Sequence, residues 1–403
     1  MPCRRIRLLG TALLASAALA APIAGAVPAA AALRAPACAD APPAAAPFAG
    51  TPWPQQRYAP QRIAPLATGD GVIVAVLDSG VDRGHPQLRG RVLAGADLLD
   101  GGDGSTDCVG HGTAVAGIIA AATAPGTGFT GLAPQARILP VRVSEQREVD
   151  GDTPGRRVDP AGLARAIRWA VDSDAGVLNL SLVLHRDEPA VRAAIAYAHS
   201  RDVVVVAVAG NRQQEGAPTP YPAAYDGVIG VGAIDETGAR ASFSQAGAYV
   251  DVVAPGVEVH ATAPGGGHRV DSGTSFAAPF VAATAALVRQ YHPGLTAAEV
   301  AARIIATADP APGAPRDGYG AGVLNPYRAV TETTQVRPAA QPDPVASVAD
   351  TAVAAAQVRR AAATDRSWRV AAVGGGVAAT LLLAAVVLPR GRRRRWRAGA
   401  ARP

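Results

Sequence analysis

The chain of 403 residues contains no lysine, so all 38 of its basic residues are arginine. Aromatic residues make up only 4% of the chain, and it has three cysteines. These shortages exclude a lysine-containing phosphate loop, and the few cysteines and histidines show no zinc-ligand spacing. Hydrophobic residues are abundant, at 49% of the total. That is enough for the core of one α/β domain of roughly 250–280 residues.

The excess of positive charge belongs to the two ends of the chain. The net charge is +6, but the first seven residues carry three arginines, and the last fifteen carry seven more without an acidic residue. Without these ten charges, residues 8–388 have a net charge of −4. Because the body of the chain is mildly acidic, its composition does not favour a nucleic-acid partner.

The first 26 residues are typical of a signal peptide. Three arginines are followed by an apolar stretch over residues 8–20 and a small-x-small cleavage site at residues 24–26. A disordered alanine-rich leader is the alternative. Acylation of Cys38 as a lipoprotein is disfavoured, because Cys38 lies far beyond the apolar stretch and a proline stands two residues before it.

Residues 370–388 form a second apolar segment, 19 residues long and without a charge. As a helix it spans about 28 Å, close to the hydrocarbon thickness of a bilayer. Trp368 precedes it and Pro389 ends it. We predict one C-terminal transmembrane helix over residues 368–389. By the positive-inside rule, the basic tail over residues 390–403 is cytoplasmic and the body of the chain is outside the cell membrane. A buried core helix is the alternative, which the arginine-rich tail disfavours.

Two cysteines remain if the signal peptide, with Cys3, is removed. Cys38 and Cys108 form an even pair in an oxidising compartment. A bridge between them would close about 70 residues and contribute roughly 4 kcal/mol on the chain-entropy model. Two free thiols are the alternative.

Composition divides the rest of the chain into three regions. Residues 27–60 are rich in alanine and proline and lack periodicity, which indicates an extended N-terminal arm on a domain surface. Residues 61–334 form the domain, with a polar stretch at residues 144–160 expected to be an exposed loop. Residues 335–367 are again rich in proline and alanine and are typical of a linker.

Strand-like and helix-like segments alternate within the domain. Residues 71–78 are apolar almost throughout, as expected for a parallel strand buried on both faces. Residues 159–173 are expected to form an amphipathic helix whose apolar stripe holds Leu163, Ile167 and Ala170. The alternation predicts an α/β fold with a doubly wound, mostly parallel sheet and helices on both faces.

Four polar residues stand where strands end and helices begin. Asp78 ends a buried strand, Asn211 follows another, and His111 and Ser275 open helices. In a doubly wound sheet these positions converge at the carboxyl edge. A nucleophilic serine needs a base, an anion that orients the base, and donors for the oxyanion. We predict that Ser275 is the nucleophile, His111 the base and Asp78 the anion that orients the base. We predict that Asn211 is an oxyanion donor.

Nine motifs then carry a family resemblance over about residues 63–330. In order they are VAVLDSGVDRGHPQL, GHGTAVAGIIA, GLAPQARILPVRV, VLNLSL, VVVAVAGN, YPAAYDGVIGVGA, FSQAGAYVDVVAPG, SGTSFAAPFVA and GYGAGVLNP. The chain resembles the subtilisin-like serine proteases, in which Asp, His and Ser occur in this order. The resemblance implies a subtilisin-like fold and a serine endopeptidase of protein or peptide substrates, without a cofactor. It implies that Ser181, Leu182 and Val183 bind an extended substrate strand.

A narrower resemblance is to the mycosins, the membrane-anchored subtilisin-like proteases of type VII secretion. The lead-in PWPQQRYAPQRIAPLATGDGV, the single C-terminal apolar segment and the positions of Cys38 and Cys108 are similar to that subgroup. The resemblance implies that the N-terminal arm wraps the catalytic domain and is linked to it by a Cys38–Cys108 bridge. It also implies that a secretion complex in the plasma membrane is a partner.

The chain also departs from these families. Many mycosins carry a second cysteine pair, after the strand that ends in SLV and after the position of Asn211, and this chain has none there. Val183 and Leu184 stand where many subtilisins have glycine, so substrate specificity cannot be carried over. The stretch between the signal peptide and the domain is too short for a folded inhibitory propeptide.

The remaining polar residues suggest structure more than chemistry. His85 precedes a proline in a turn and is expected to be structural. Asp100, Asp103 and Asp107 resemble a calcium loop in composition, but their spacing departs from the EF-hand pattern, and we predict no metal site. Two functions are left open: an endopeptidase acting on secreted proteins, and a structural subunit of a membrane complex in which proteolysis is secondary.

Overall fold

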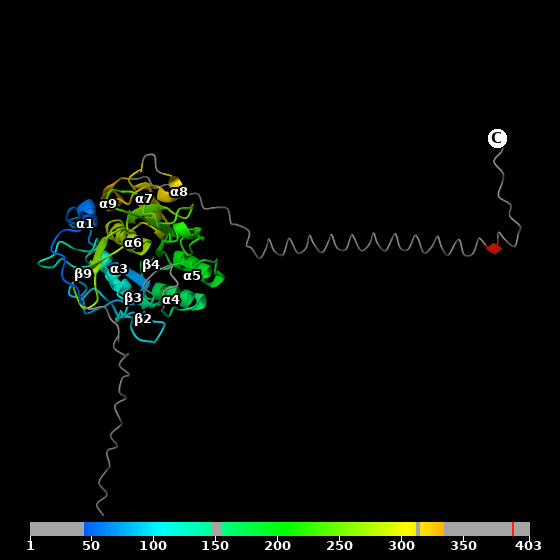
Figure 1. The fold of residues 1–403 in the computed structure, drawn as a ribbon, viewed down its shortest axis with the longest axis horizontal. Helices are drawn as coiled ribbons and strands as arrows, with labels where there is room; N and C mark the ends of the chain where they lie inside the picture. Colours follow the sequence, from blue (N-terminus) through cyan, green and yellow to red (C-terminus); the bar gives the residue numbers. More distant parts are fainter. Residues whose placement is uncertain (1–43, 147–154, 312–314, 334–388, 391–403) are drawn as a thin grey trace, which may run out of the picture. The chain divides into compact units, whose positions relative to one another are not determined.

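The computed structural model describes residues 44–146, 155–311, 315–333 and 389–390. Contacts divide the chain into two units, residues 1–336 and 337–403, and the labelled helices and strands all belong to the first (Figure 1). The expected signal peptide, Cys38, the linker and nearly all of the expected membrane span lie outside the described residues. Within the described residues, none of the helices is long and apolar enough to cross a membrane.

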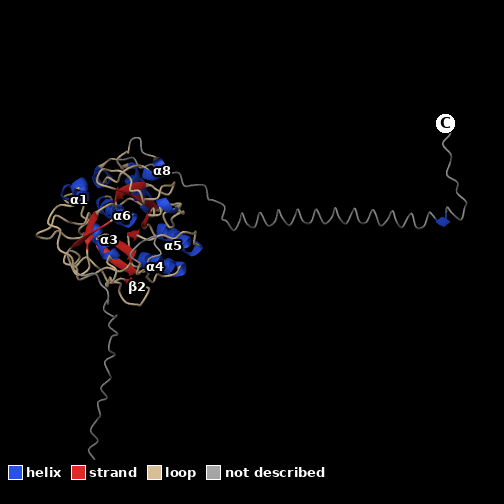
Figure 2. Ribbon diagram, viewed as in Figure 1, coloured by secondary structure: helices blue, strands red, loops and turns tan. Residues whose placement is uncertain are grey.

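A seven-stranded parallel sheet is the centre of the described domain. Figure 2 shows its strands in the interior with helices around them. The spatial order is β2-β3-β1-β4-β5-β6-β7, so the chain adds strands first on one side of β1 and then on the other. The strands are β1 (Ile73–Asp78), β2 (Ala96–Asp97), β3 (Arg137–Arg142), β4 (Val177–Leu180), β5 (Val204–Val208), β6 (Ile229–Ile234) and β7 (Val252–Pro255).

Helices cover both faces of this sheet, and this confirms the predicted doubly wound α/β architecture. Among the described residues, the face with α3 and α6 also carries α2, α7 and α9, whereas α4 and α5 pack on the other face and against each other (Figure 1). The helices are α1 (Trp53–Tyr58), α2 (Pro60–Ile63), α3 (His111–Ala120), α4 (Pro160–Asp172), α5 (Pro189–Ser200), α6 (Thr274–Tyr291), α7 (Ala297–Ala306), α8 (Arg316–Tyr319) and α9 (Pro326–Thr331), with a 3₁₀ turn at Gln213–Glu215.

The two-sided burial explains why the strands are apolar throughout. In β1, Val74 and Val76 point into the core under α3 and α6, and the alternate residues Ala75 and Leu77 point into the core under α4 and α5. All four side chains are inaccessible to solvent. Successive residues of a strand face opposite sides, so a strand covered on both faces needs apolar residues at every position.

The predicted amphipathic helix is α4. Asp159 caps its first turn by accepting a hydrogen bond from the backbone N–H of Gly162 at 2.6 Å, as an N-cap carboxylate is expected to do. The expected stripe of Leu163, Ile167 and Ala170 is buried against the sheet. The hydrophobic pattern therefore fixes which face of the helix is buried.

The N-terminal arm differs in part from the extended segment that we expected. Residues 44–48 do run alongside another segment, because the N–H of Ala45 donates to Gly266 O at 3.0 Å and the N–H of Phe48 donates to His268 Nδ1 at 2.9 Å. The end of the arm, however, is helical as α1, and α2 begins at its last residue. Tyr58 of α1 is buried with its ring 5.5 Å from that of Phe280, so tertiary packing overrides a composition rich in proline.

A second, two-stranded sheet was not predicted. Strands β8 (Val259–Thr262) and β9 (His268–Asp271) pair in an antiparallel hairpin beside α3. The close approach of α3 depends on Gly117, since an added Cβ there would lie 2.0 Å from Thr262 Oγ1.

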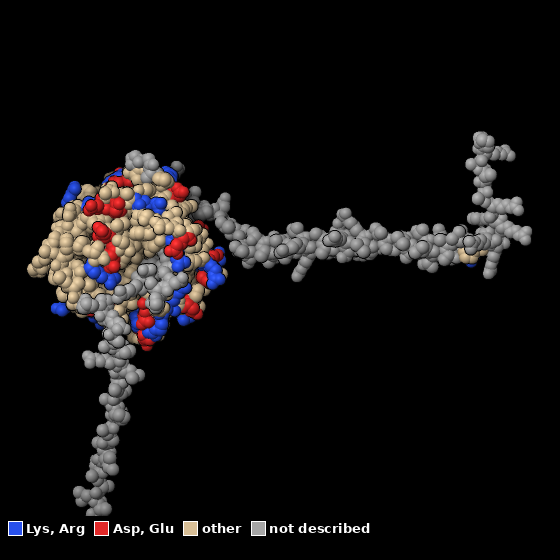
Figure 3. All heavy atoms as spheres, viewed as in Figure 1, with Lys and Arg blue, Asp and Glu red and all other residues tan. Residues whose placement is uncertain are grey.

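On the face of the domain shown in Figure 3, arginine and acidic side chains are interspersed.

Candidate active site

Three of the expected site residues are placed by the carboxyl edge of the sheet. Asp78 is the last residue of β1, Ser181 directly follows β4, and Asn211 comes three residues after the end of β5. Strands β1, β4 and β5 are neighbours in the sheet. The edge lies where the chain changes from one side of β1 to the other, and such a switch point is the usual place for a site in an open α/β sheet.

His111 begins α3, and its imidazole lies against the Asp78 carboxylate. The distance from His111 Nδ1 to Asp78 Oδ1 is 2.7 Å, and the same oxygen accepts the backbone N–H of Ser79 at 2.7 Å. Both side chains are buried. Since a carboxylate only accepts, this contact requires the proton on Nδ1 and leaves Nε2 as the basic atom of the imidazole. Among the described residues, Nε2 has no hydrogen-bond partner.

The environment makes His111 a stronger base than an ordinary histidine. Burial lowers the pKa of His111, but the charge of Asp78 and its hydrogen bond raise it by more, and Asp107 adds to that effect. Arg269 acts in the opposite direction through its charge. The net result is a pKa above the ordinary value of 6.5. A base with such a pKa is well matched to taking up a proton near neutral pH.

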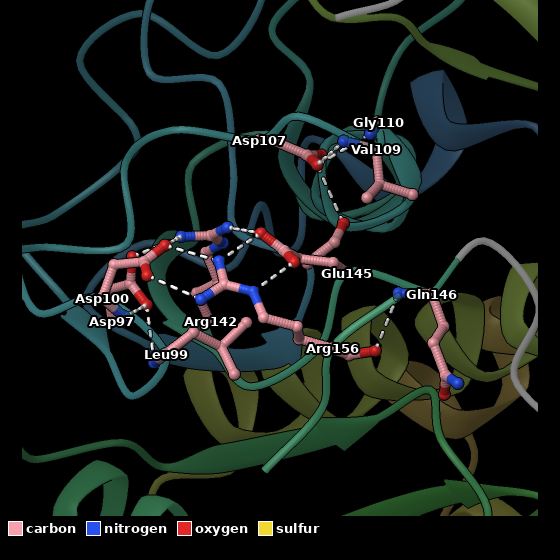
Figure 4. Close-up of polar contacts among 12 residues, drawn as sticks. Asp97, Leu99, Asp100, Asp107, Val109, Gly110, Arg142, Glu145, Gln146 and Arg156 are labelled. Atoms are coloured by element: carbon pink, nitrogen blue, oxygen red, sulfur yellow. Dashed lines mark hydrogen bonds and ion pairs between the residues drawn. The ribbon is translucent and has the colours of Figure 1, made fainter. Parts of the chain in front are cut away.

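A buried carboxylate, Asp107, fixes the distance between β1 and the start of α3. Asp107 Oδ1 accepts from Ser79 Oγ at 2.9 Å and from the N–H groups of Val109 and Gly110 at 3.0 and 2.7 Å. Oδ2 accepts from Thr113, through its N–H at 2.8 Å and its hydroxyl at 2.6 Å. Figure 4 shows Asp107 pointing at the turn before α3. Asp107 resembles part of a calcium loop in composition only, and in the structure it positions His111.

Ser275 lies in the first turn of α6, close to His111 and to the residues that follow β4. Its backbone carbonyl accepts the Ser181 hydroxyl at 3.3 Å. The ring of Phe276, the next residue, lies 5.3 Å from the His111 imidazole. No hydrogen bond joins Ser275 Oγ to His111 Nε2 in the described structure. Such catalytic contacts are often long before substrate binds.

Asn211 is oriented by its contacts with the start of α6. Its Oδ1 accepts from the N–H and the hydroxyl of Thr274, both at 2.9 Å, so the amide nitrogen faces the other way. A Cβ added to Gly273 would lie 3.1 Å from Ser275 Oγ and 3.6 Å from Asn211 Nδ2. The space over Gly273 is therefore bordered by both the serine hydroxyl and the amide donor, and glycine keeps that space open.

A pocket extends from His111 along the segment after β4. The predicted substrate-binding residues Ser181, Leu182 and Val183 line it. The pocket holds about 510 Å³ of space, part of it open to solvent, and its lining is mainly apolar. Opposite walls come from the end of β3 and the segment before α4, and the further lining residues are Asp78, Val143, Ser144, Gln146, Arg157, Val158, Leu163 and Leu184.

Asp100 and Asp103, the other two aspartates of this stretch, are bound by arginines. Asp100 lies between the guanidinium groups of Arg142 and Arg156 (Figure 4). Asp103 pairs with Arg83 at 2.9 Å. Arginine thus supplies the positive charge that a cation would bring. In the described ranges there is no group of three or more metal-ligating side chains arranged to hold an ion.

Two other expected residues have structural contacts. His85 Nε2 lies 3.1 Å from Gly267 O, and its Nδ1 accepts the N–H of Gln87 at 3.2 Å. Cys108 is disulfide-bonded. Because Cys38 lies outside the described residues, the Cys38–Cys108 pairing stays a prediction, which peptide mapping without reductant can check.

The fold and this arrangement of residues define a subtilisin-like serine protease. The model of the subtilase family matches residues 69–322, so the chain belongs to that family. It is 41% identical over 279 residues to the thermophilic serine proteinase of Bacillus sp. (strain AK1), a match that covers 69% of this chain and 66% of that protein. It is 38% identical over 280 residues to thermitase of Thermoactinomyces vulgaris, with 68% and 96% of the two chains covered.

Solved structures of mycosins are also similar. MycP1 from Mycobacterium smegmatis matches with a TM-score of 0.66 and 32% identity, over 76% of this chain and 92% of that one. MycP3 protease from the type VII (ESX-3) secretion system matches with a TM-score of 0.62 and 33% identity, over 71% and 91%. The likeness supports the mycosin resemblance drawn from the sequence.

Removal of the Asn211 amide is expected to affect the rate rather than binding. If Nδ2 donates to an oxyanion, Asn211→Ala should lower kcat by about 10²–10³ with little change in KM, the loss seen on removing such a donor from the related enzyme subtilisin. Steady-state kinetics on a peptide substrate measure both constants. A rise in KM at constant kcat would instead make Asn211 a binding residue.

The acid limb of the pH profile is expected to report the raised pKa of His111. The imidazole must be neutral to accept a proton, so kcat/KM should fall as the pH drops through a value above 6.5. Arg269→Gln removes a charge that lowers this pKa and should move the limb to higher pH. A limb below pH 6.5, or a shift to lower pH in the variant, would contradict this account.

Proposed function

We propose that this protein is a membrane-anchored serine endopeptidase that hydrolyses peptide bonds of secreted proteins. The observation that carries the proposal is the buried 2.7 Å contact between Asp78 and His111 beside the Ser275 turn of α6. A buried, oriented imidazole with a raised pKa next to a serine at a helix start is the arrangement that activates a hydroxyl.

The reaction proceeds in two halves. Ser275 Oγ attacks the scissile carbonyl carbon as its proton passes to His111 Nε2, and Asp78 stabilises the imidazolium that forms. The oxyanion is held by Asn211 Nδ2 and by the N–H of Ser275, which has no acceptor within the first turn of α6. His111 then protonates the departing amine. In the second half a water molecule, deprotonated by His111, attacks the acyl-enzyme and releases the acid and the serine.

The pocket gives the substrate its path. An extended chain pairing with the backbone of Ser181 to Val183 would run along the pocket that begins at His111. Val183 is buried in the core under α3 and α6, so its side chain is turned away and its backbone is left for pairing. The apolar lining supports substrates with large apolar side chains.

The proposed location rests on the sequence of the two ends. The basic and apolar start supports export, and the uncharged segment over residues 370–388 with its arginine-rich tail supports a single-pass anchor with the tail in the cytoplasm. The likeness to MycP3, from a type VII secretion system, supports a secretion complex as the partner. A bridge between Cys38 and Cys108 would fasten the arm to the catalytic domain.

A structural role in that complex is the second candidate. It is favoured by the arm, whose residues 44–48 pair with the hairpin far along the chain and whose helices α1 and α2 pack on the domain. These contacts cover surface without touching the pocket residues.

Secretion in complemented strains separates the two candidates. Ser275→Ala removes one oxygen from a preformed site, so proteolysis should fall by several orders of magnitude while the fold and surface stay intact. If the structural role is real, a deletion strain should lose secretion and the Ser275→Ala chain should restore it, with uncleaved substrate accumulating outside. Equal loss of secretion in both strains would leave proteolysis as the whole function.

The orientation in the membrane can be tested with an external protease. The tail over residues 390–403 should be protected in intact cells, because the positive-inside rule places it in the cytoplasm. The catalytic domain should become accessible once any outer envelope is permeabilised. Cleavage of the tail in intact cells would reverse the proposed topology.

A further inference from the structure

Five charged side chains form one continuous group beside the pocket, which we call the ion cluster: Asp97, Asp100, Arg142, Glu145 and Arg156 (Figure 4). Arg142 is the inner member. Its Nη1 donates to Asp97 Oδ2 at 2.6 Å and to Asp100 Oδ2 at 3.0 Å, and its Nη2 donates to Glu145.

Arg156 is the outer member and joins two of the same carboxylates. It donates to both oxygens of Asp100 at 2.8 and 2.9 Å and to both oxygens of Glu145 at 2.8 Å. Isolated surface ion pairs contribute little to stability. Bidentate arginine–carboxylate contacts in a network are the exception, because good geometry adds to the attraction of the charges. The arginines hold the pKa of Asp100 at about 2 and lower that of Glu145, so both carboxylates stay ionised at neutral pH.

The cluster is tied to the catalytic edge at its inner end. Arg142 ends β3, where it lies directly beside Asp78 in the register of the sheet, and its side chain is only 8% exposed. The next residue, Val143, donates its N–H to Asp78 O at 2.8 Å. The inner end of the cluster therefore cannot move without disturbing the sheet.

The outer end is tied to one wall of the pocket. Glu145 stands between the lining residues Ser144 and Gln146, and Arg156 stands directly before the lining residue Arg157. The two segments pair: Glu145 N–H donates to Arg156 O at 2.7 Å, and Ser144 and Arg157 form an antiparallel bridge. The wall thus consists of two short segments whose side chains, on the side away from the pocket, are held together by the ion cluster.

We propose that the ion cluster is a positioning device for substrate binding: Arg156, held by Asp100 and Glu145, fixes the wall formed by residues 143–146 and 155–158 at the distance from Ser181–Val183 that an extended substrate requires. This inference rests on the proposed endopeptidase function, because it assumes that the pocket binds substrate. Arg156 acts through Glu145 and the backbone, so it is a positioning residue and contacts no reacting atom.

The role predicts a split between substrates of different length. A short ester or amide that occupies only the position next to the scissile bond does not reach this wall. A peptide extended by three residues on the N-terminal side does reach it. Loosening the wall should weaken binding of the long peptide in the ground state and the transition state alike, which raises KM and leaves kcat unchanged.

Arg156→Gln is the variant of choice, because Arg156 is 56% exposed and its loss leaves no buried unpaired charge. We expect KM for the long peptide to rise about three- to tenfold, with kcat for both substrates and KM for the short one unchanged. Arg156→Lys keeps the charge but cannot make the paired contacts. Its KM for the long peptide should therefore lie between those of the unaltered protein and of Arg156→Gln. If Arg156→Gln fails to fold, Arg156→Lys carries the same test.

The matched control is Arg328→Gln. Arg328 also bridges two carboxylates, those of Asp309 and Glu332, and is 36% exposed, but it does not line the pocket. Arg328→Gln should leave kcat and KM unchanged for both substrates. An unchanged KM for the long peptide in Arg156→Gln, an equal change for both substrates, or the same change in the control would overturn the proposal. Absence of hydrolysis of the short substrate by the unaltered protein would instead overturn the proposed function.

Discussion

The site depends on one buried carboxylate, that of Asp107. Its two oxygens accept five hydrogen bonds, from Ser79 at the end of β1 and from Val109, Gly110 and Thr113 at the start of α3. Burial raises the pKa of Asp107, against these donors, which lower it. These contacts hold the end of β1 against the start of α3. The 2.7 Å contact between Asp78, next to Ser79, and His111, next to Gly110, is a consequence of that spacing.

Much of the fold could be predicted because the hydrophobic pattern encodes it. Buried parallel strands need apolar residues at every position, and α4 shows its buried stripe in the spacing of Leu163 and Ile167. The four expected site residues could be placed at one edge from the sequence, because strand ends and helix starts meet there in such a sheet. The helices of the arm could not, since α1 is formed by packing of Tyr58 on Phe280 rather than by local propensity.

The sequence could not reveal which partners the charged side chains contact in the folded chain. Asp100, Asp103 and Asp107 are close in sequence and alike in type, yet Asp107 turns inward to α3 and the other two turn outward to arginines. The partners Arg142 and Arg156 lie more than forty residues further along the chain. Side-chain direction in an irregular loop follows from tertiary contacts, and a single sequence carries no periodic signal for it.

The wide separation of the site residues along the chain bears on when activity can first arise. Asp78 and His111 belong to the first third of the domain, whereas Ser275 arrives only with α6, which packs across β4, β5, β6 and β7. Closing such long loops is slow, and parallel sheets form late for that reason. A chain that has folded only its first half lacks the nucleophile at the base. Because of this topology, the site is incomplete, and the protease inactive, until folding is complete.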